Sequence, residues 1–337
     1  MENTRVIVSK FGGPEVLKII REPLRMPQKN EIRVKVLSSG VALGDVMRRE
    51  GVFPFPPTLP FTPGYDAIGI VDEPGSDVNQ LSKGDKVAVF FNGTGGYATY
   101  VYAKEDEVTA IPADIDPVLG VAVTLNYVTA YQMLHRFAKV SEGDRILIHG
   151  ASGGTGTALL ELGKLAKLKM FGTASSAKHE IVLKYGAVPI DYREEDFVQV
   201  LRNQAPEGMD AVFDPIGGEN YNRSLQTLNE NGRCIVYGYT SVLEKRNSSN
   251  WSNEWKQIAE NEKAQGGNPQ SLYTITGLKK ERLDWFREDL QIVFSLLKEG
   301  KIKPIIAEKM PLTEAARAQQ LLEKSKAIGK VVLTNES

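Results

Sequence analysis

The chain contains one cysteine, three histidines and no long apolar run among its 337 residues. A single cysteine excludes an intrachain disulfide, a CxxC redox pair and a structural zinc site built from four cysteines. A catalytic zinc needs about three protein ligands, and Cys234 has no histidine near it in the sequence. We therefore predict no metal. Without a stretch of about 18 apolar residues or a signal-peptide pattern, we expect a cytoplasmic protein with no membrane partner.

Neither sign of charge dominates, because 41 Lys and Arg residues stand against 42 Asp and Glu residues, mixed along the chain. This balance argues against nucleic acid as a partner, since nucleic-acid-binding proteins carry a basic patch or stripe. The length indicates about two domains.

Two patterns of secondary structure follow one another. The first third has short β-rich runs separated by Gly- and Pro-containing turns, which predicts a barrel-like β domain. From about residue 120, strands and helices alternate, and this pattern predicts a doubly wound parallel sheet. The predicted strands of that sheet are Arg145–His149, Met170–Ala174, Val188–Ile190, Ala211–Phe213 and Cys234–Tyr237. Near the end we predict a helix over Leu283–Lys298 and a strand over Ile302–Ile306. Residues 241–280 are polar and weakly periodic, and we interpret them as a long surface excursion.

A glycine-rich turn follows the first of these strands. The sequence from Gly150 to Gly156 reads GASGGTG and leads into a helix. Glycines permit a tight turn and close approach to a pyrophosphate, and the helix N-terminus offers free N–H groups for phosphate. The alternative is a tight structural turn that binds nothing. The predicted cofactor-binding residues of the turn are Ser152, Gly153, Gly154, Thr155 and Gly156.

The end of the second strand indicates which dinucleotide binds. An NAD site places Asp or Glu there, to hold the ribose 2′-hydroxyl. This chain has Ser175, Ser176 and Lys178 instead, which suit a 2′-phosphate. In the alternative interpretation, the serines cap the next helix and Lys178 is solvated. We predict NADPH as the cofactor.

The motifs resemble, in order, the zinc-independent medium-chain dehydrogenase/reductase superfamily, in its quinone-oxidoreductase-like group. They are FGGPEVL (11–17), SGVALGDVMRREG (39–51), PGYDAIGIV (63–71), LNYVTAYQML (125–134), GDRILIHGASGGTGTA (143–158), YGA (185–187), DAVFDPIGG (210–218) and GKVVL (329–333). The resemblance implies an α/β protein with a GroES-like β-barrel catalytic domain over 1–124 and 291–337. It also implies a Rossmann NADPH-binding domain over 125–290 and a homodimer or a dimer of dimers.

The resemblance implies further site residues. Tyr192 matches a tyrosine beside the 2′-phosphate, Thr129 a residue near the nicotinamide, and Lys330 a basic residue near the cofactor. Gly238, after the last predicted strand of the sheet, completes the predicted cofactor set. The alternative for Tyr192 is an ordinary surface aromatic residue.

Two departures from the family pattern bear on the chemistry. Ala42 stands where quinone reductases often have Asn, and Phe53 stands where enoyl thioester reductases have a proton-donating tyrosine. Asp45 and Tyr65 are the candidate catalytic residues, able to orient substrate or relay a proton. The alternatives are a helix-capping role for Asp45 and a packed core position for Tyr65.

The predicted function is NADPH-dependent hydride transfer to a small-molecule acceptor, a quinone or an α,β-unsaturated carbonyl. Such acceptors take hydride without a Lewis acid, so that positioning carries the reaction. The alternatives are an enoyl thioester reductase with a different proton donor and a catalytically quiet NADPH-binding protein.

Overall fold

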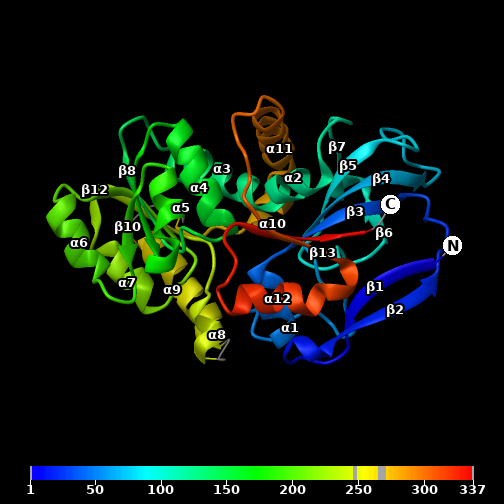
Figure 1. Ribbon diagram of the computed structural model, residues 1–337, viewed down its shortest axis with the longest axis horizontal. Helices are drawn as coiled ribbons and strands as arrows, with labels where there is room; N and C mark the ends of the chain where they lie inside the picture. Colours follow the sequence, from blue (N-terminus) through cyan, green and yellow to red (C-terminus); the bar gives the residue numbers. More distant parts are fainter. Residues whose placement is uncertain (1, 246–248, 265–270, 336–337) are drawn as a thin grey trace. The chain divides into compact units, whose positions relative to one another are not determined.

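The computed structural model describes residues 2–245, 249–264 and 271–335. The chain forms two compact units (Figure 1). Unit 1 comprises Met1–Leu125 and Arg282–Ser337, and unit 2 comprises Asn126–Glu281. The chain therefore leaves unit 1 once and returns to it after completing unit 2.

Unit 1 is built on a curved sheet of seven strands, in the order β13-β14-β3-β4-β5-β7 with β6 also paired to β3. These strands are β3 (Glu31–Val41), β4 (Asp66–Pro74), β5 (Lys86–Phe90), β6 (Tyr100–Lys104), β7 (Val108–Ala110), β13 (Ile306–Pro311) and β14 (Lys330–Thr334). The first half of β3 pairs with β6 and its second half with β14, while β4 lies along its other edge. One long strand thereby bends the sheet around its core. The hairpin of β1 (Glu2–Val8) and β2 (Leu17–Pro23) forms a separate ribbon.

The helices of unit 1 are α1 (Leu43–Glu50), α2 (Pro117–Ala122), α11 (Leu283–Lys298) and α12 (Ala315–Glu323), with 3-10 turns at Pro14–Val16, Glu105–Glu107 and Leu312–Glu314. The bounds of α11 are those predicted. The strand predicted over Ile302–Ile306 is wrong, because β13 begins only at Ile306. Pro304 lacks an amide donor and keeps the preceding segment out of the sheet.

A buried arginine joins α1 to α12. The Arg49 side chain is fully buried, and its Nε donates to the Gly12 carbonyl at 3.0 Å. Its Nη1 donates to Gln319 Oε1 at 3.0 Å, and Nη2 donates to Glu50 and Glu323. These bonds satisfy a charge that would otherwise be costly to bury.

We predict that Arg49→Met destabilises the protein by about 3 kcal/mol, because it leaves the two glutamates without their buried partner. Urea denaturation followed by circular dichroism measures the loss. Arg317→Met is the control: Arg317 is exposed and pairs with Glu308 and Glu314, so its removal changes the free energy of unfolding by less than about 0.5 kcal/mol. Equal losses of unfolding free energy in Arg49→Met and Arg317→Met would contradict the stabilising role of the buried Arg49.

Unit 2 is a parallel sheet of five strands in the order β10-β9-β8-β11-β12. The strands are β8 (Arg145–Ile148), β9 (Lys169–Ala174), β10 (Val188–Asp191), β11 (Met209–Asp214) and β12 (Leu228–Val236). The strand order reverses between β8 and β11, and in such sheets ligands bind at the carboxyl edge of that reversal. The glycine turn leaves β8 at this edge.

The helices of unit 2 are α3 (Val128–Tyr131), α4 (Gly154–Leu165), α5 (His179–Lys184), α6 (Phe197–Gln204), α7 (Glu219–Leu225), α8 (Ser241–Lys245), α9 (Ser249–Ala264) and α10 (Ile275–Glu281). Ser176–Lys178 forms a 3-10 turn, and π-helical turns cover Val123–Tyr127, which crosses the unit boundary, and Gln132–Ala138.

The prediction of a surface excursion over 241–280 is wrong for the residues that the structure describes there. They form α8, α9 and the start of α10, and Trp251, Ile258 and Tyr273 are buried. Trp251, Trp255 and Ile258 are spaced as i, i+4 and i+7, which is one narrow apolar face of a helix. Polar residues around that face hid the period. Residues 246–248 and 265–270 lie outside the described residues.

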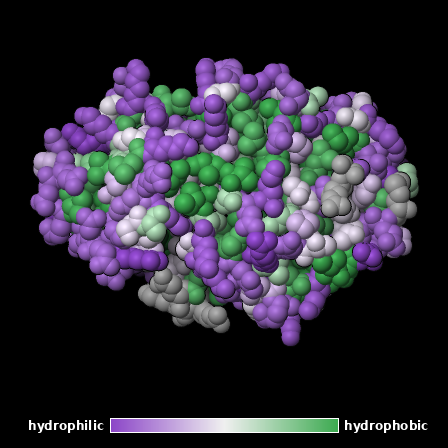
Figure 2. All heavy atoms as spheres, in the orientation of Figure 1, coloured by the Kyte–Doolittle hydropathy of each residue, from purple (hydrophilic) through white to green (hydrophobic). Residues whose placement is uncertain are grey.

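Hydrophilic side chains cover much of the face shown in Figure 2, with hydrophobic ones scattered among them. No helix in the described part of the chain is both long and apolar enough to cross a bilayer. Within residues 2–245, 249–264 and 271–335, no three His, Cys, Asp or Glu side chains are grouped to hold a metal ion.

Candidate cofactor site and catalytic residues

The glycine turn after β8 brings α4 very close to the strand. A Cβ on Gly156 would lie 2.3 Å from the Gly150 carbonyl oxygen and 2.7 Å from Ala151 Cα, so only glycine fits there. Gly150 itself has a φ of +64°, in the left-handed region that favours glycine. Helix α4 begins at Gly154 with Gly153 as its N-cap, and no side chain caps it. Its first N–H groups therefore remain available to a phosphate.

Two buried polar atoms, one in α3 and one just before it, have no hydrogen-bond partner among the described residues, and α3 packs against α4. Asn126 donates through Nδ2 to Thr155 Oγ1 at 2.9 Å, which leaves its own Oδ1 unpaired. Thr129 Oγ1 is unpaired as well. Unpaired buried polar atoms are costly, and a polar ligand relieves that cost. The fit to a dinucleotide therefore extends beyond the glycines. Thr129 was predicted, whereas Asn126 was missed because its role depends on a contact with Thr155.

We predict that Gly156→Ala lowers both the melting temperature and the affinity for NADPH, because its Cβ forces α4 away from Gly150. The matched control is Gly153→Ala, whose Cβ meets only the Gly150 oxygen at 3.4 Å and whose N-cap backbone is extended. This variant should keep the melting temperature of the wild type. Differential scanning fluorimetry with and without NADPH separates the two effects. An unchanged melting temperature in Gly156→Ala would contradict the packing argument.

The segment after β9 carries a cluster of cations and one carboxylate. Burial lowers the pKa of Lys178, and the Arg193 charge adds to this effect. Asp191, at the end of β10, accepts hydrogen bonds from the N–H groups of Ser176 and Arg193, each at 3.0 Å. These backbone N–H groups hold the pKa of Asp191 below its usual range. The sequence of β9 has no carboxylate at this end, but the fold brings one in from the neighbouring strand.

The remaining predicted cofactor residues lie in different surroundings. Tyr192 is 52% exposed, and the Arg193 guanidinium lies 5.6 Å from its ring centroid. Gly238 follows β12, and a Cβ there would lie 2.8 Å from the Pro215 carbonyl oxygen. Lys330 is in unit 1, where its buried Nζ lies 3.7 Å from Asp66 Oδ2. Its closest carboxylate is therefore Asp66, whose pKa is raised by burial against the opposing effect of the Lys330 charge.

Asp45 is a fully buried carboxylate that holds several backbone segments together. Its Oδ2 accepts from the Ala42 N–H at 2.8 Å and from the Tyr97 hydroxyl at 3.0 Å. Its Oδ1 accepts from the Gly64 N–H at 3.0 Å. Burial nevertheless raises its pKa from 3.8 to about 6, opposed most strongly by the Ala42 N–H. By accepting from the Ala42 N–H, Asp45 caps the start of α1, which is the helix-capping alternative for this residue.

We predict a pH-dependent effect of Asp45→Asn. Between about pH 4 and pH 6, folded Asp45 keeps a proton that the unfolded chain has released, so rising pH favours unfolding of the wild type by up to about 3 kcal/mol. The asparagine does not titrate, and either orientation of its amide turns an N–H toward the N–H of Ala42 or of Gly64. The variant should therefore be less stable than the wild type at about pH 4, with the deficit shrinking toward pH 7. Urea denaturation across this range measures it, and a deficit independent of pH would contradict the account.

Tyr65 is buried beside an arginine that sequence reasoning missed. The Tyr65 hydroxyl accepts a hydrogen bond from Arg48 Nη1. Burial raises the pKa of Tyr65, although the Arg48 charge and hydrogen bond oppose the shift. The phenol therefore keeps its proton at neutral pH, and that proton remains available for donation. Phe53, which has no hydroxyl, lies against the same guanidinium, with Arg48 Cζ 3.7 Å from its ring centroid.

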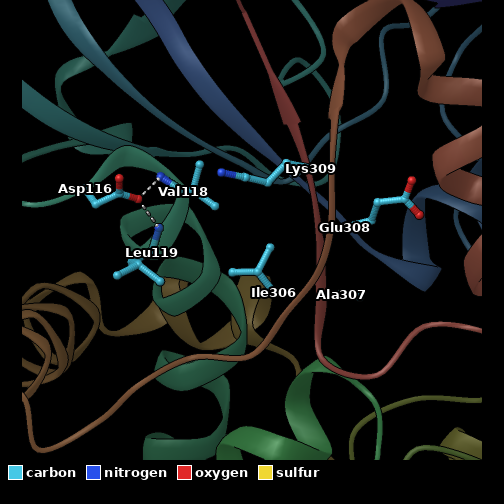
Figure 3. Close-up of a pocket in the computed structure, with 7 residues that line it drawn as sticks. All are labelled: Asp116, Val118, Leu119, Ile306, Ala307, Glu308 and Lys309. Carbon is cyan, nitrogen blue, oxygen red and sulfur yellow. Dashed lines mark hydrogen bonds between the residues drawn. The ribbon is translucent and has the colours of Figure 1, made fainter.

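A pocket of about 450 Å³ also lies in unit 1, where the start of α2 faces β13. Asp116 caps α2, because its Oδ1 accepts from the N–H groups of Val118 and Leu119 at 2.9 and 3.0 Å (Figure 3). On β13, Lys309 extends toward α2, whereas Glu308 points away (Figure 3) and pairs with Arg317. The pocket contains no predicted site residue, so it does not belong to the candidate site.

Comparison with known proteins covers both units. The family model of the alcohol dehydrogenase GroES-like domain matches residues 28–113, and that of zinc-binding dehydrogenase matches 185–333. A quinone oxidoreductase of Rattus norvegicus is 31% identical over 331 residues, covering 97% of this chain and 96% of the relative. A synaptic vesicle membrane protein VAT-1 homolog-like protein of Homo sapiens is 32% identical over 349 residues, covering 99% of this chain and 81% of the relative.

Among solved structures, the Escherichia coli quinone oxidoreductase complexed with NADPH matches with a TM-score of 0.84 and 28% identity. The match covers 98% of this chain and all (100%) of that one. With the GroES-like family match and the parallel sheet of unit 2, it confirms the predicted fold class.

Proposed function

This chain belongs to the quinone oxidoreductase family of the medium-chain dehydrogenases and reductases, and we propose that it transfers hydride from NADPH to a quinone or an α,β-unsaturated carbonyl compound without zinc. We assign cofactor binding to unit 2 and acceptor binding to unit 1. A homodimer, as the family resemblance implies, and a location in the cytoplasm complete the proposal.

The cofactor assignment rests on the segment after β9, where the sequence places Ser175, Ser176 and Lys178 and no carboxylate, and where the Arg193 charge acts on Lys178. A doubly charged 2′-phosphate would relieve the repulsion between the two cations and accept hydrogen bonds from the hydroxyls. The uncapped start of α4 would hold the pyrophosphate. The unpaired oxygens of Asn126 and Thr129 would bind polar groups of the same cofactor.

The chemistry of the reaction follows from what the chain's residues do. When bound, the reduced nicotinamide supplies a hydride, and the acceptor takes it at an electron-poor carbon. Tyr65 is the candidate to orient the acceptor by donating a hydrogen bond to it, because its hydroxyl is held by Arg48 and keeps its own proton, while solvent protonates the reduced product. We assign Asp45 a positioning role, since its oxygens already accept bonds from Ala42, Gly64 and Tyr97. Positioning of the reactants is then the main source of rate.

We predict that Lys178→Met raises KM for NADPH about tenfold or more while leaving KM for NADH almost unchanged, because only NADPH carries the 2′-phosphate. Lys164→Met, on the exposed side of α4, is the control and should change neither value. The kinetics require an acceptor, which a panel of quinones, enones, enals and enoyl thioesters provides. An equal rise in KM for NADPH and for NADH would contradict the assignment of Lys178 to the 2′-phosphate.

Cofactor oxidation across the same panel tests the acceptor class. The proposal expects turnover with quinones or with enones and enals, and little with enoyl thioesters, because Phe53 lacks a hydroxyl. Turnover confined to enoyl thioesters would indicate an enoyl thioester reductase with a proton donor other than residue 53. NADPH binding with no turnover on any acceptor would indicate a protein that only binds the cofactor.

A further inference from the structure

Arg48 is a buried cation without an anionic partner among the described residues. Its side chain lies in unit 1, on α1, and only 6% of its surface is exposed. No carboxylate of the described chain lies within 4 Å of its nitrogens. Asp45 is close enough for the Arg48 charge to affect its pKa, but its two oxygens are engaged elsewhere. By contrast, the neighbouring Arg49 is paired with two glutamates.

The guanidinium is held firmly in one orientation. Nη1 donates to the Tyr65 hydroxyl and lies 3.4 Å from the Gly44 carbonyl oxygen. The Phe53 ring stacks on it at 3.7 Å, and the Tyr65 ring centroid lies 4.6 Å from Cζ. Gly93 leaves space for it, because a Cβ there would lie 2.4 Å from Cζ. A long flexible side chain is thereby fixed before any ligand arrives, which lowers the entropic cost of binding.

The orientation leaves one edge of the guanidinium unused. Nη1 is occupied, whereas Nε and Nη2 make no hydrogen bond within the described residues. Nε and Nη2 donate in parallel from the same side of the planar group, and this fork matches the two oxygens of a carboxylate. The Tyr65 hydroxyl accepts from Arg48, so its own proton can be donated to the same anion. The arrangement offers three donors and no acceptor.

We propose that Arg48, supported by Tyr65 and Phe53, binds a carboxylate of the hydride acceptor, so that the physiological acceptor is a carboxylate-bearing quinone or enone. That the bound ligand is the hydride acceptor rests on the proposed function. The anion site itself follows from the contacts of Arg48 within unit 1. A buried charge without a counter-ion is costly, and a ligand that supplies the counter-ion recovers that cost on binding. A neutral acceptor would leave the fork unsatisfied.

Matched substrates test the proposal by kinetics with NADPH. The pair is 3-acetylacrylate, an enone with a free carboxylate, and its methyl ester, which presents the same reacting carbons without the charge. The wild type should prefer the carboxylate in kcat/KM. Arg48→Met should lower kcat/KM for the carboxylate about 100-fold, mainly through KM, and the loss of kcat/KM on the ester should be at least about tenfold smaller. Arg48→Lys keeps the charge but not the fork, and should lose about tenfold on the carboxylate.

Two results would overturn the proposal: equal kcat/KM for the acid and the ester in the wild type, or an equal loss of kcat on both in Arg48→Met. The second would place Arg48 at the reacting oxygen. Arg317→Met, which removes an exposed arginine of the same unit, controls for a change in net charge. Thermal melts establish that each variant is folded.

A binding measurement separates this inference from the proposed reaction. Isothermal titration calorimetry in the absence of NADPH needs no turnover, and its ligand is 4-oxopentanoate, a saturated analogue that lacks the alkene carbon to which an enone takes hydride. We expect binding to the wild type and to Arg317→Met and none to Arg48→Met. Binding that depends on Arg48 in a protein that reduces no acceptor would refute the proposed reaction and support the anion site. Absence of binding to the wild type, or binding unchanged in Arg48→Met, would refute the anion site even if quinones are reduced.

Discussion

Helix α4 starts so close to strand β8 that a side chain on Gly156 would collide with the Gly150 carbonyl oxygen, at 2.3 Å. This approach brings the unpaired N–H groups of the helix to the carboxyl edge of the parallel sheet, at the point where the strand order reverses. The Asn126 amide bonds to Thr155 in the first turn of α4 and fixes it from the side. The candidate cofactor site thus depends on the contact between Gly156 and the Gly150 carbonyl, where no side chain fits.

Unit 1 buries several charges, and the way each is satisfied indicates its role. Arg49 is surrounded by acceptors and joins α1 to α12. Asp45 is surrounded by donors and fixes the backbone of Ala42 and Gly64. Arg48 differs, because stacking and the hydrogen bonds of Nη1 orient it, but no anion among the described residues neutralises it. A charge that is fixed but not paired is what a binding group needs, whereas a paired charge stabilises the fold.

The sequence was sufficient for the features that depend on local pattern. The strand–turn–helix around Gly150–Gly156 and the bounds of α11 follow from glycine spacing and helical period, and the structure has both. Helix α9 escaped prediction because its apolar face is narrow. Asp191 reaches Ser176 only because β10 pairs with β9. Arg48 meets Tyr65 through the fold, across 17 positions of sequence. Contacts of this kind have no local signature, and they decide the chemistry.

We propose that the end of β9 selects NADPH, and direct titration of the wild-type protein tests this selection without any assumption about the acceptor. The quenching of tryptophan fluorescence by NADPH and by NADH gives both dissociation constants under the same conditions. We predict that the dissociation constant of NADPH is at least about tenfold lower than that of NADH, because Lys178 and Arg193 attract the additional phosphate. Equal dissociation constants, or tighter binding of NADH, would contradict it.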